Sequence, residues 1–141
     1  AHAAGGVAVM LDLLPRCKGL YQTRLATVLA VTSQTAKAAG ELRRRGGILV
    51  LVPFLAQQSM REHCMHTLKN ILANDSRQGE GCKEARLAGV IPYAISALDS
   101  TNQVLVEDTM GLLSVMVSRD PLSSCEEIRR HGGVPYVVNH L

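Results

Sequence analysis

Short glycine-containing segments recur through the chain at a nearly constant spacing. In chain order they are Gly5-Gly6-Val7, Gly46-Gly47-Ile48, Gly89-Val90-Ile91 and Gly132-Gly133-Val134. Successive segments begin 41, 43 and 43 residues apart. A fixed period of this length predicts stacked copies of one supersecondary unit, because each copy buries its apolar face only against its neighbours.

Each full copy reads as three helices. In the copy 46–88, residues 48–56 form a short apolar helix, and the capping box Ser59-x-x-Glu62 starts a longer one. Residues 80–88 form the third helix of that copy. In the copy 89–131 the long helix covers 104–118, and Ser123-x-x-Glu126 starts the short one. Alternation of apolar and polar residues never persists, so strands are not expected.

The period divides the chain into one array. It consists of a partial copy 1–45, full copies 46–88 and 89–131, and a partial copy 132–141. The last segment offers apolar side chains with no long helix after them to cover them: Val134, Tyr136, Val137, Val138 and Leu141. Terminal copies of a stacked array need a polar outer face, so we expect this array to be a fragment of a longer one.

The copies resemble the armadillo repeat. The second helix of that family reads roughly G-G-I-P-x-L-V-x-L-L, and similar stretches occupy 132–141 and 89–98. The stretch 64–71 resembles the A-x-x-x-L-x-N-L of the long third helix. The resemblance implies an all-α fold, an α-solenoid of stacked three-helix armadillo repeats in a right-handed superhelix. HEAT repeats are the nearest alternative, but the glycine pairs and the three-helix unit favour armadillo.

The resemblance also implies a binding groove. In armadillo proteins the long third helices line a concave surface, where an Asn bonds the backbone of an extended peptide and a Trp lies one turn earlier. These positions hold Asn70 and His66 in one copy, and in the others Val115 with Gly111 and Val31 with Thr27. Since one Asn and no Trp remain, we expect a partner to bind through shape and apolar contact. The expected groove residues are His66, Lys69, Asn70, Gly111, Ser114 and Val115.

A basic edge is the second candidate surface. Arg43, Arg86 and Arg129 are 43 residues apart, and so are Glu41, Glu84 and Glu127. Arginines near helix C-termini complement the helix dipole, and a Glu of one copy could meet an Arg of the next. Alternatively these arginines form a ridge that contacts an acidic partner or a phosphate backbone, widened by Arg44, Arg45, Lys83 and Arg130. No aromatic side chains interleave with them for base stacking, which makes nucleic acid the poorer version.

The sequence offers no catalytic constellation and no cofactor motif. His63-Cys64-x-His66 has the spacing of one helical turn, but no second ligand pair follows it, so we expect no metal. A net charge of +3 is too small to indicate nucleic acid by itself. We therefore expect neither enzymatic activity nor a small-molecule substrate.

The four cysteines bear on location. Cys82 and Cys125 are 43 residues apart and so occupy equivalent places in consecutive copies. Stacked helices lie about 8–10 Å apart, beyond the roughly 7 Å that a disulfide can span between Cα atoms. We expect reduced thiols in an intracellular, cytoplasmic protein. No apolar run approaches a membrane span, and no signal peptide is recognisable.

The function expected from the sequence is a non-catalytic protein-binding scaffold, a structural component of a large ciliary or cytoskeletal assembly. The alternative is a cargo or nucleic-acid adaptor that uses the arginine edge. A third possibility is a regulatory, small-molecule-binding armadillo domain attached to an enzyme.

Overall fold

The computed structural model describes residues 3–75 and 79–139, and the side chains of all of these except residues 3–5, 136 and 139. Tyr136 and Leu141, named above in the last segment, lie outside the described side chains. The described residues form helices and no strands. In chain order the helices are α1 (Ala3–Leu13), η1 (Leu14–Arg16), α2 (Gly19–Thr32), α3 (Ala36–Arg44), α4 (Gly47–Leu51), η2 (Val52–Ala56), α5 (Gln58–Ala73), α6 (Glu80–Leu87), α7 (Val90–Ala97), α8 (Gln103–Arg119), α9 (Pro121–Arg130) and α10 (Val134–Asn139).

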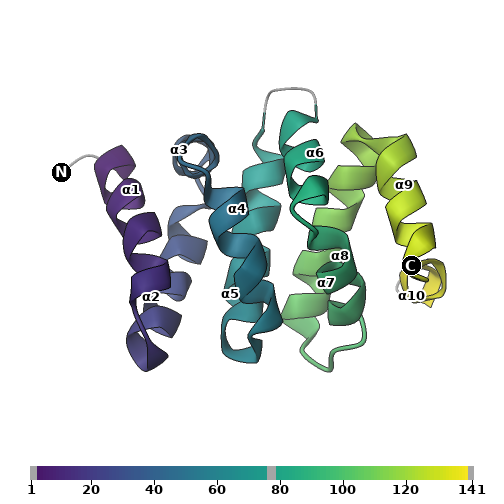
Figure 1. Ribbon diagram of the computed structural model, residues 1–141, viewed down its shortest axis with the longest axis horizontal. Coiled ribbons are helices and arrows are strands. Elements are labelled where there is room, and N and C mark those ends of the chain that lie inside the picture. Colours follow the sequence, from purple (N-terminus) through teal and green to yellow (C-terminus); the bar gives the residue numbers. More distant parts are fainter. Residues whose placement is uncertain (1–2, 76–78, 140–141) are drawn as a thin grey trace.

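The helices stand side by side along the longest axis of the molecule, and the two ends of the chain lie at opposite ends of that axis (Figure 1). The long helix α5 packs between the long helices α2 and α8. The short helices α3, α6 and α9 lie along one edge, at the top of Figure 1. The described helices of the copy 46–88 are α4, η2, α5 and α6, of which α4 and η2 together occupy the predicted first helix, and those of the copy 89–131 are α7, α8 and α9.

Glycines end the short helices of three copies. Gly46, Gly89 and Gly132 have φ of 77°, 91° and 70°, the left-handed conformation that favours glycine after a helix. Gly5 and Gly6 differ, because they lie inside α1 rather than before it. The first copy therefore has the glycine pair in its sequence, but these glycines do not end a helix as the glycines of the other three copies do.

Neither predicted capping box forms. Ser59 lies inside α5, which begins at Gln58, and Ser123 lies inside α9, which begins at Pro121. Glu62 does not fold back onto its own helix end, since its carboxylate accepts a hydrogen bond from Asn102 of the next copy. Side-chain caps occur instead at Thr35, which accepts from the backbone N–H of Ala38, and at Asn102, which accepts from that of Leu105.

The helix predicted over 48–56 is split. α4 passes directly into the 3₁₀ helix η2, because Pro53 has no N–H to donate to the carbonyl four residues earlier. One apolar core runs through the stack from α1 to α9 and is built from aliphatic and sulfur-containing side chains, as the scarcity of aromatics predicts. Its largest fully buried members are Leu14, Leu29, Leu42, Ile48, Leu51, Leu55, Met60, Met65, Leu68, Ile71, Leu72 and Ile91.

Candidate functional site

A pocket of about 220 Å³ opens where the three long helices α2, α5 and α8 meet. We call it the groove pocket. The described residues that line it are Thr27, Ala30, Val31, Gln34, Glu62, His63, His66, Val104 and Asp108. Of the predicted groove residues, only His66 is among them. Thr27 and Val31, which the family comparison placed at the groove positions of the first copy, also line the pocket.

Asp108 is the centre of the polar contacts beside this pocket. Its side chain is buried in α8, and its Oδ1 accepts hydrogen bonds from His66 Nδ1 at 3.0 Å and from Lys69 Nζ at 2.9 Å. Both donors come from α5, so Asp108 joins the long helices of two copies. Its Oδ2 is buried and has no hydrogen-bond partner among the described residues.

Gly111 gives Lys69 the room to reach Asp108. A Cβ at residue 111 would lie 2.9 Å from Lys69 Cδ, closer than carbon atoms normally approach. The aliphatic part of Lys69 therefore passes over Gly111 on its way to the carboxylate. The structure thus brings the predicted groove residues His66, Lys69 and Gly111 together, but Lys69 covers Gly111 instead of leaving it open.

The proton of one pocket histidine can be assigned. Thr27 Oγ1 lies 3.0 Å from the carbonyl oxygen of Thr23 and 3.1 Å from His63 Nε2, and its single hydroxyl proton can be donated to only one of them. A carboxylate only accepts, so His66 carries its proton on Nδ1 when neutral. Nε2 of a neutral His66 is then a hydrogen-bond acceptor.

Asn70 is engaged within the fold. Its Nδ2 donates to Ser33 Oγ at 3.0 Å, and Ser33, which is completely buried, donates in turn to the carbonyl of Ala30. The side chain thus links α5 to the end of α2. One of the two N–H donors of the amide that would bond a peptide carbonyl in the armadillo manner is therefore engaged.

The other two predicted groove residues lie on α8 away from the pocket lining. Ser114 is exposed, and Val115 is half-buried and packs against the core. The backbone carbonyl of Val115 accepts a weak hydrogen bond from the thiol of Cys82, which fixes α8 against α6.

Two of the three arginines that define the predicted edge form ion pairs between copies. Arg43 Nε lies 3.6 Å from Asp75 Oδ1, with side-chain exposures of 14% and 2%. Arg86 Nε donates to Asp120 Oδ2 at 3.0 Å, with exposures of 16% and 22%. Where a Glu of one copy was expected to meet an Arg of the next, the acids that meet Arg43 and Arg86 are aspartates that follow the long helices.

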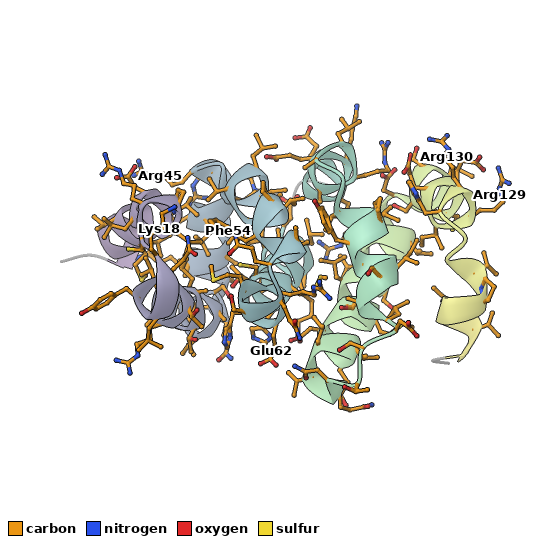
Figure 2. The ribbon with its side chains drawn as sticks, turned by 60° about the horizontal axis from the view of Figure 1, so that its bottom comes forward. Lys18, Arg45, Phe54, Glu62, Arg129 and Arg130 are labelled. Carbon is orange, nitrogen blue, oxygen red and sulfur yellow. The ribbon has the colours of Figure 1, made fainter. Side chains whose placement is uncertain are left out.

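Four further arginines of this edge have acidic neighbours on their own helices. Arg129 pairs with Glu126, and Arg130 pairs with Glu127. Arg44 and Arg45 both bond Glu41. The hydrogen bonds from Arg45 and Arg44 lower the pKa of the Glu41 carboxyl. Arg45, Arg129 and Arg130 project on the opposite edge of the molecule from Glu62 (Figure 2).

The four cysteines are free thiols, and they differ in how deeply they are buried. Cys64 and Cys82 are buried, and desolvation raises their pKa to about 12 and about 11 respectively. Cys125, the equivalent of Cys82, is exposed. In the part of the chain that the structure describes, no group of three or more His, Cys, Asp or Glu side chains could hold a metal ion. None of the described helices is both long and apolar enough to cross a membrane.

Comparison with known proteins finds a structural neighbour and leaves the function open. No protein-family model matches the chain, and no curated protein matches it. Among solved structures it is similar to the crystal structure of an engineered protein from the Northeast Structural Genomics Consortium, with a TM-score of 0.81 and 25% sequence identity. The match covers 96% of this chain and 54% of that one, so this chain spans about half the length of the engineered protein.

Sequence reasoning missed Asp108, the residue that organises the site. The stretch 104–118 is apolar on most faces and its evident polar residues are Glu107, Ser114 and Ser118, so Asp108 does not stand out in the sequence. A signal was present, because Asp108 precedes Gly111 by three residues and therefore lies on the same helix face. Glu62 was missed for a different reason, since its spacing from Ser59 suggested a helix cap.

Proposed function

We propose that the chain is an α-solenoid of the armadillo type and acts as a non-catalytic scaffold that binds other proteins along α2, α5 and α8. The observation that carries this proposal is the groove pocket, because three long helices from three successive copies contribute to it. A surface assembled from repeated helices suits an extended partner segment, which can contact several copies at once.

The chemistry of the pocket supports binding rather than catalysis. His66 has an orienting carboxylate, but neither a serine nor a cysteine is among the described residues that line the pocket. Thr27 is the one hydroxyl residue among the described residues of that lining, and its hydroxyl lies within hydrogen-bond distance of the Thr23 carbonyl. Thr27 Oγ1 lies 3.1 Å from His63 Nε2, but none of the described residues places an acid on the other ring nitrogen of His63, the third group that orients the base of an activated nucleophile.

The alternative, an adaptor for acidic cargo or nucleic acid, has less support. It would use Arg43, Arg86 and Arg129, yet two of these are half-buried in ion pairs with Asp75 and Asp120. Binding of phosphate by these arginines would break the ion pairs and so remove contacts between neighbouring copies. An intracellular role in a ciliary or cytoskeletal assembly remains part of the proposal, and localisation of the tagged full-length protein would test it.

Selection of peptides from a random linear library displayed on phage tests the scaffold proposal. Val31 and Val104 are exposed at the rim of the pocket, so Val31→Trp and Val104→Trp should fill it without disturbing the core. We expect selected peptides to lose at least tenfold in affinity for both variants and to bind the control variant Leu87→Trp normally. Leu87 is a matched control because it is exposed on α6, outside the pocket lining. Peptides that bind all four proteins equally would contradict the proposal.

A further inference from the structure

The outer face of α2 carries an exposed apolar surface at one end of the molecule. Tyr21 is 80% exposed and Leu20 is 64% exposed, and both lie in the first turn of the helix. Val28, two turns further on, is exposed as well. We call these three residues, together with the cations Lys18 and Arg24 described below, the end patch.

Comparison of the long helices shows which way this face points. Six residues after its N-cap, α5 has His63, which bonds Thr27 of α2. At the same place α8 has Asp108, which bonds two residues of α5. This side of each long helix therefore faces the preceding long helix. In α2 the position holds Arg24, so the end patch points away from the stack.

The apolar members of the end patch share this side of the helix. Tyr21 and Val28 lie three and ten residues after the N-cap of α2. At the same places α5 has Met60 and Thr67 and α8 has Leu105 and Leu112, and all four are buried. A contiguous apolar surface that is left open in this way indicates an interaction site.

The end patch is also positively charged. Lys18 and Arg24 are exposed, and neither forms an ion pair with any of the described residues. Arg24 lies one turn after Leu20 and one turn before Val28, which places it among the apolar side chains. The nearby Arg16 pairs with Asp12, the one acid between residues 6 and 32. Figure 2 shows Lys18 at the opposite end of the molecule from Arg129 and Arg130.

These charges distinguish the end patch from a contact between two copies. In α8, which packs on α5, the places of Lys18 and Arg24 hold the neutral Asn102 and the acidic Asp108. That contact suits a neighbour with cations, whereas the end patch needs negative charge opposite its own cations. Its occupant must therefore combine an apolar phase with anionic groups.

We propose that the end patch binds the surface of a membrane that contains anionic lipids, a function beyond the scaffold role proposed above. A bilayer presents anionic headgroups directly over an apolar interior. Leu20 and Tyr21 enter the boundary between the two, a region in which tyrosine is favoured because its ring is apolar and its hydroxyl is polar. Lys18 and Arg24 contact the headgroups.

Sedimentation with lipid vesicles tests the proposal. The probes are vesicles of phosphatidylcholine alone and vesicles in which about one-third of the lipid is phosphatidylserine. We expect the chain to bind the anionic vesicles at least tenfold more tightly, and added salt to weaken this binding because it screens the charges. Equal binding to both kinds of vesicle, or none to the anionic vesicles at low salt, would overturn the proposal.

A fluorescent reporter locates the contact. The chain contains no tryptophan, so Tyr21→Trp introduces a single one into the end patch. Its emission should shift to shorter wavelength with anionic vesicles and be quenched by brominated lipids. Leu87→Trp is the matched control, because Leu87 is exposed on α6, and its emission should not change. An equal response of the two reporters would place the membrane contact elsewhere and contradict the proposal.

Two double variants separate local charge from net charge. Lys18→Glu with Arg24→Glu should weaken binding to anionic vesicles at least tenfold. Arg129→Glu with Arg130→Glu changes the net charge equally at the other end of the molecule, and should weaken binding twofold or less. All four side chains are exposed, and circular dichroism checks that both variants fold. Equal losses would show that net charge, and not the end patch, is responsible.

A second copy of the chain is the competing occupant of the end patch. Sedimentation velocity without lipid, at rising protein concentration, should show no association that depends on Tyr21. If the chain associates and Tyr21→Ser prevents it, the end patch packs on another copy and the membrane proposal is wrong. Either result leaves the scaffold proposal untouched, because no end-patch residue is among the described residues that line the groove pocket.

Discussion

Arg86 and Asp120 join two copies of the sequence pattern through a hydrogen bond of 3.0 Å between the guanidinium Nε and the carboxylate Oδ2. The same relationship occurs one copy earlier, where Arg43 faces Asp75. In both cases the arginine belongs to a short helix, and the aspartate follows the long helix of the next copy. Arg43 and Arg86 therefore hold neighbouring copies together, a role that the periodicity of the arginines alone did not distinguish from a basic binding ridge.

Removing Arg86 should destabilise the fold. Arg86→Ala leaves the half-buried Asp120 without its partner, and we expect the free energy of unfolding to fall by about 1–2 kcal/mol. Urea denaturation followed by circular dichroism measures this change. Arg129→Ala is the control at the equivalent position of the next copy, where the arginine is exposed and should leave the midpoint unchanged. Equal midpoints for Arg86→Ala and the parent protein would contradict the role of the pair.

Two glycines with the same backbone conformation should respond differently to alanine. Gly79 and Gly89 have φ of 90° and 91°, so both substitutions pay the cost of a left-handed alanine, about 1 kcal/mol. At residue 79 the new Cβ would also lie 2.6 Å from the backbone carbonyl oxygen of Arg119, while at residue 89 nothing lies within 4 Å. We expect Gly79→Ala to cost at least about 1 kcal/mol more than Gly89→Ala in thermal or urea unfolding, because backbone cannot move aside as a side chain can. Equal costs would show that the loop before α6 relaxes freely.

Loss of the Asp108 carboxylate should weaken the contact between α5 and α8. Asp108→Ala removes the acceptor of both His66 and Lys69, and we expect a loss of about 1–3 kcal/mol in the free energy of unfolding. Glu107→Ala, one residue earlier and exposed, should change it by less than about 0.5 kcal/mol. A stable Asp108→Ala variant would indicate that the unpartnered Oδ2 offsets what the other oxygen gains.

Two substitutions separate an apolar groove from an armadillo-type peptide clamp. Gly111→Trp pushes Lys69 off α8 and should abolish binding of peptides selected on the groove. Asn70→Ala should weaken that binding by tenfold or less, since the Asn70 amide already donates to Ser33. Fluorescence anisotropy with labelled peptides gives the two affinities, and circular dichroism checks that both variants fold. Elimination of binding by Asn70→Ala in a folded protein would show that the clamp operates.

The cysteines should differ in reactivity because they differ in burial. The thiolate is the reactive form, so the raised pKa of Cys64 and Cys82 should keep both unreactive toward iodoacetamide at pH 8. The exposed Cys125 should be alkylated first. Peptide mapping by mass spectrometry after timed exposure gives the order, and denaturant should bring all four thiols to similar rates. Early labelling of Cys64 in native conditions would contradict the packing of α5 against its neighbours.

The sequence by itself determined the helices, their repetition and the inward-facing positions. Apolar residues at helical spacing place Leu68, Ile71 and Leu72 on the buried side of α5, and glycines end the short helices because left-handed backbone excludes most other residues. These properties are local, because each is determined by residues that lie close together in the sequence. The same locality explains the errors at Ser59 and Ser123, since a capping pattern is correct only when its acid has no better partner elsewhere.

Only the tertiary structure decided which polar side chains meet. Asp108 bonds two residues about 40 positions earlier, and Arg86 bonds an aspartate 34 positions later, distances at which spacing along the chain carries no information about contact. Stacking brings these groups together, and burial then requires each charge to find a partner because water is excluded. The sequence of each helix determines which of its faces is apolar, whereas the contacts that a face makes depend on the neighbouring helix that packs against it.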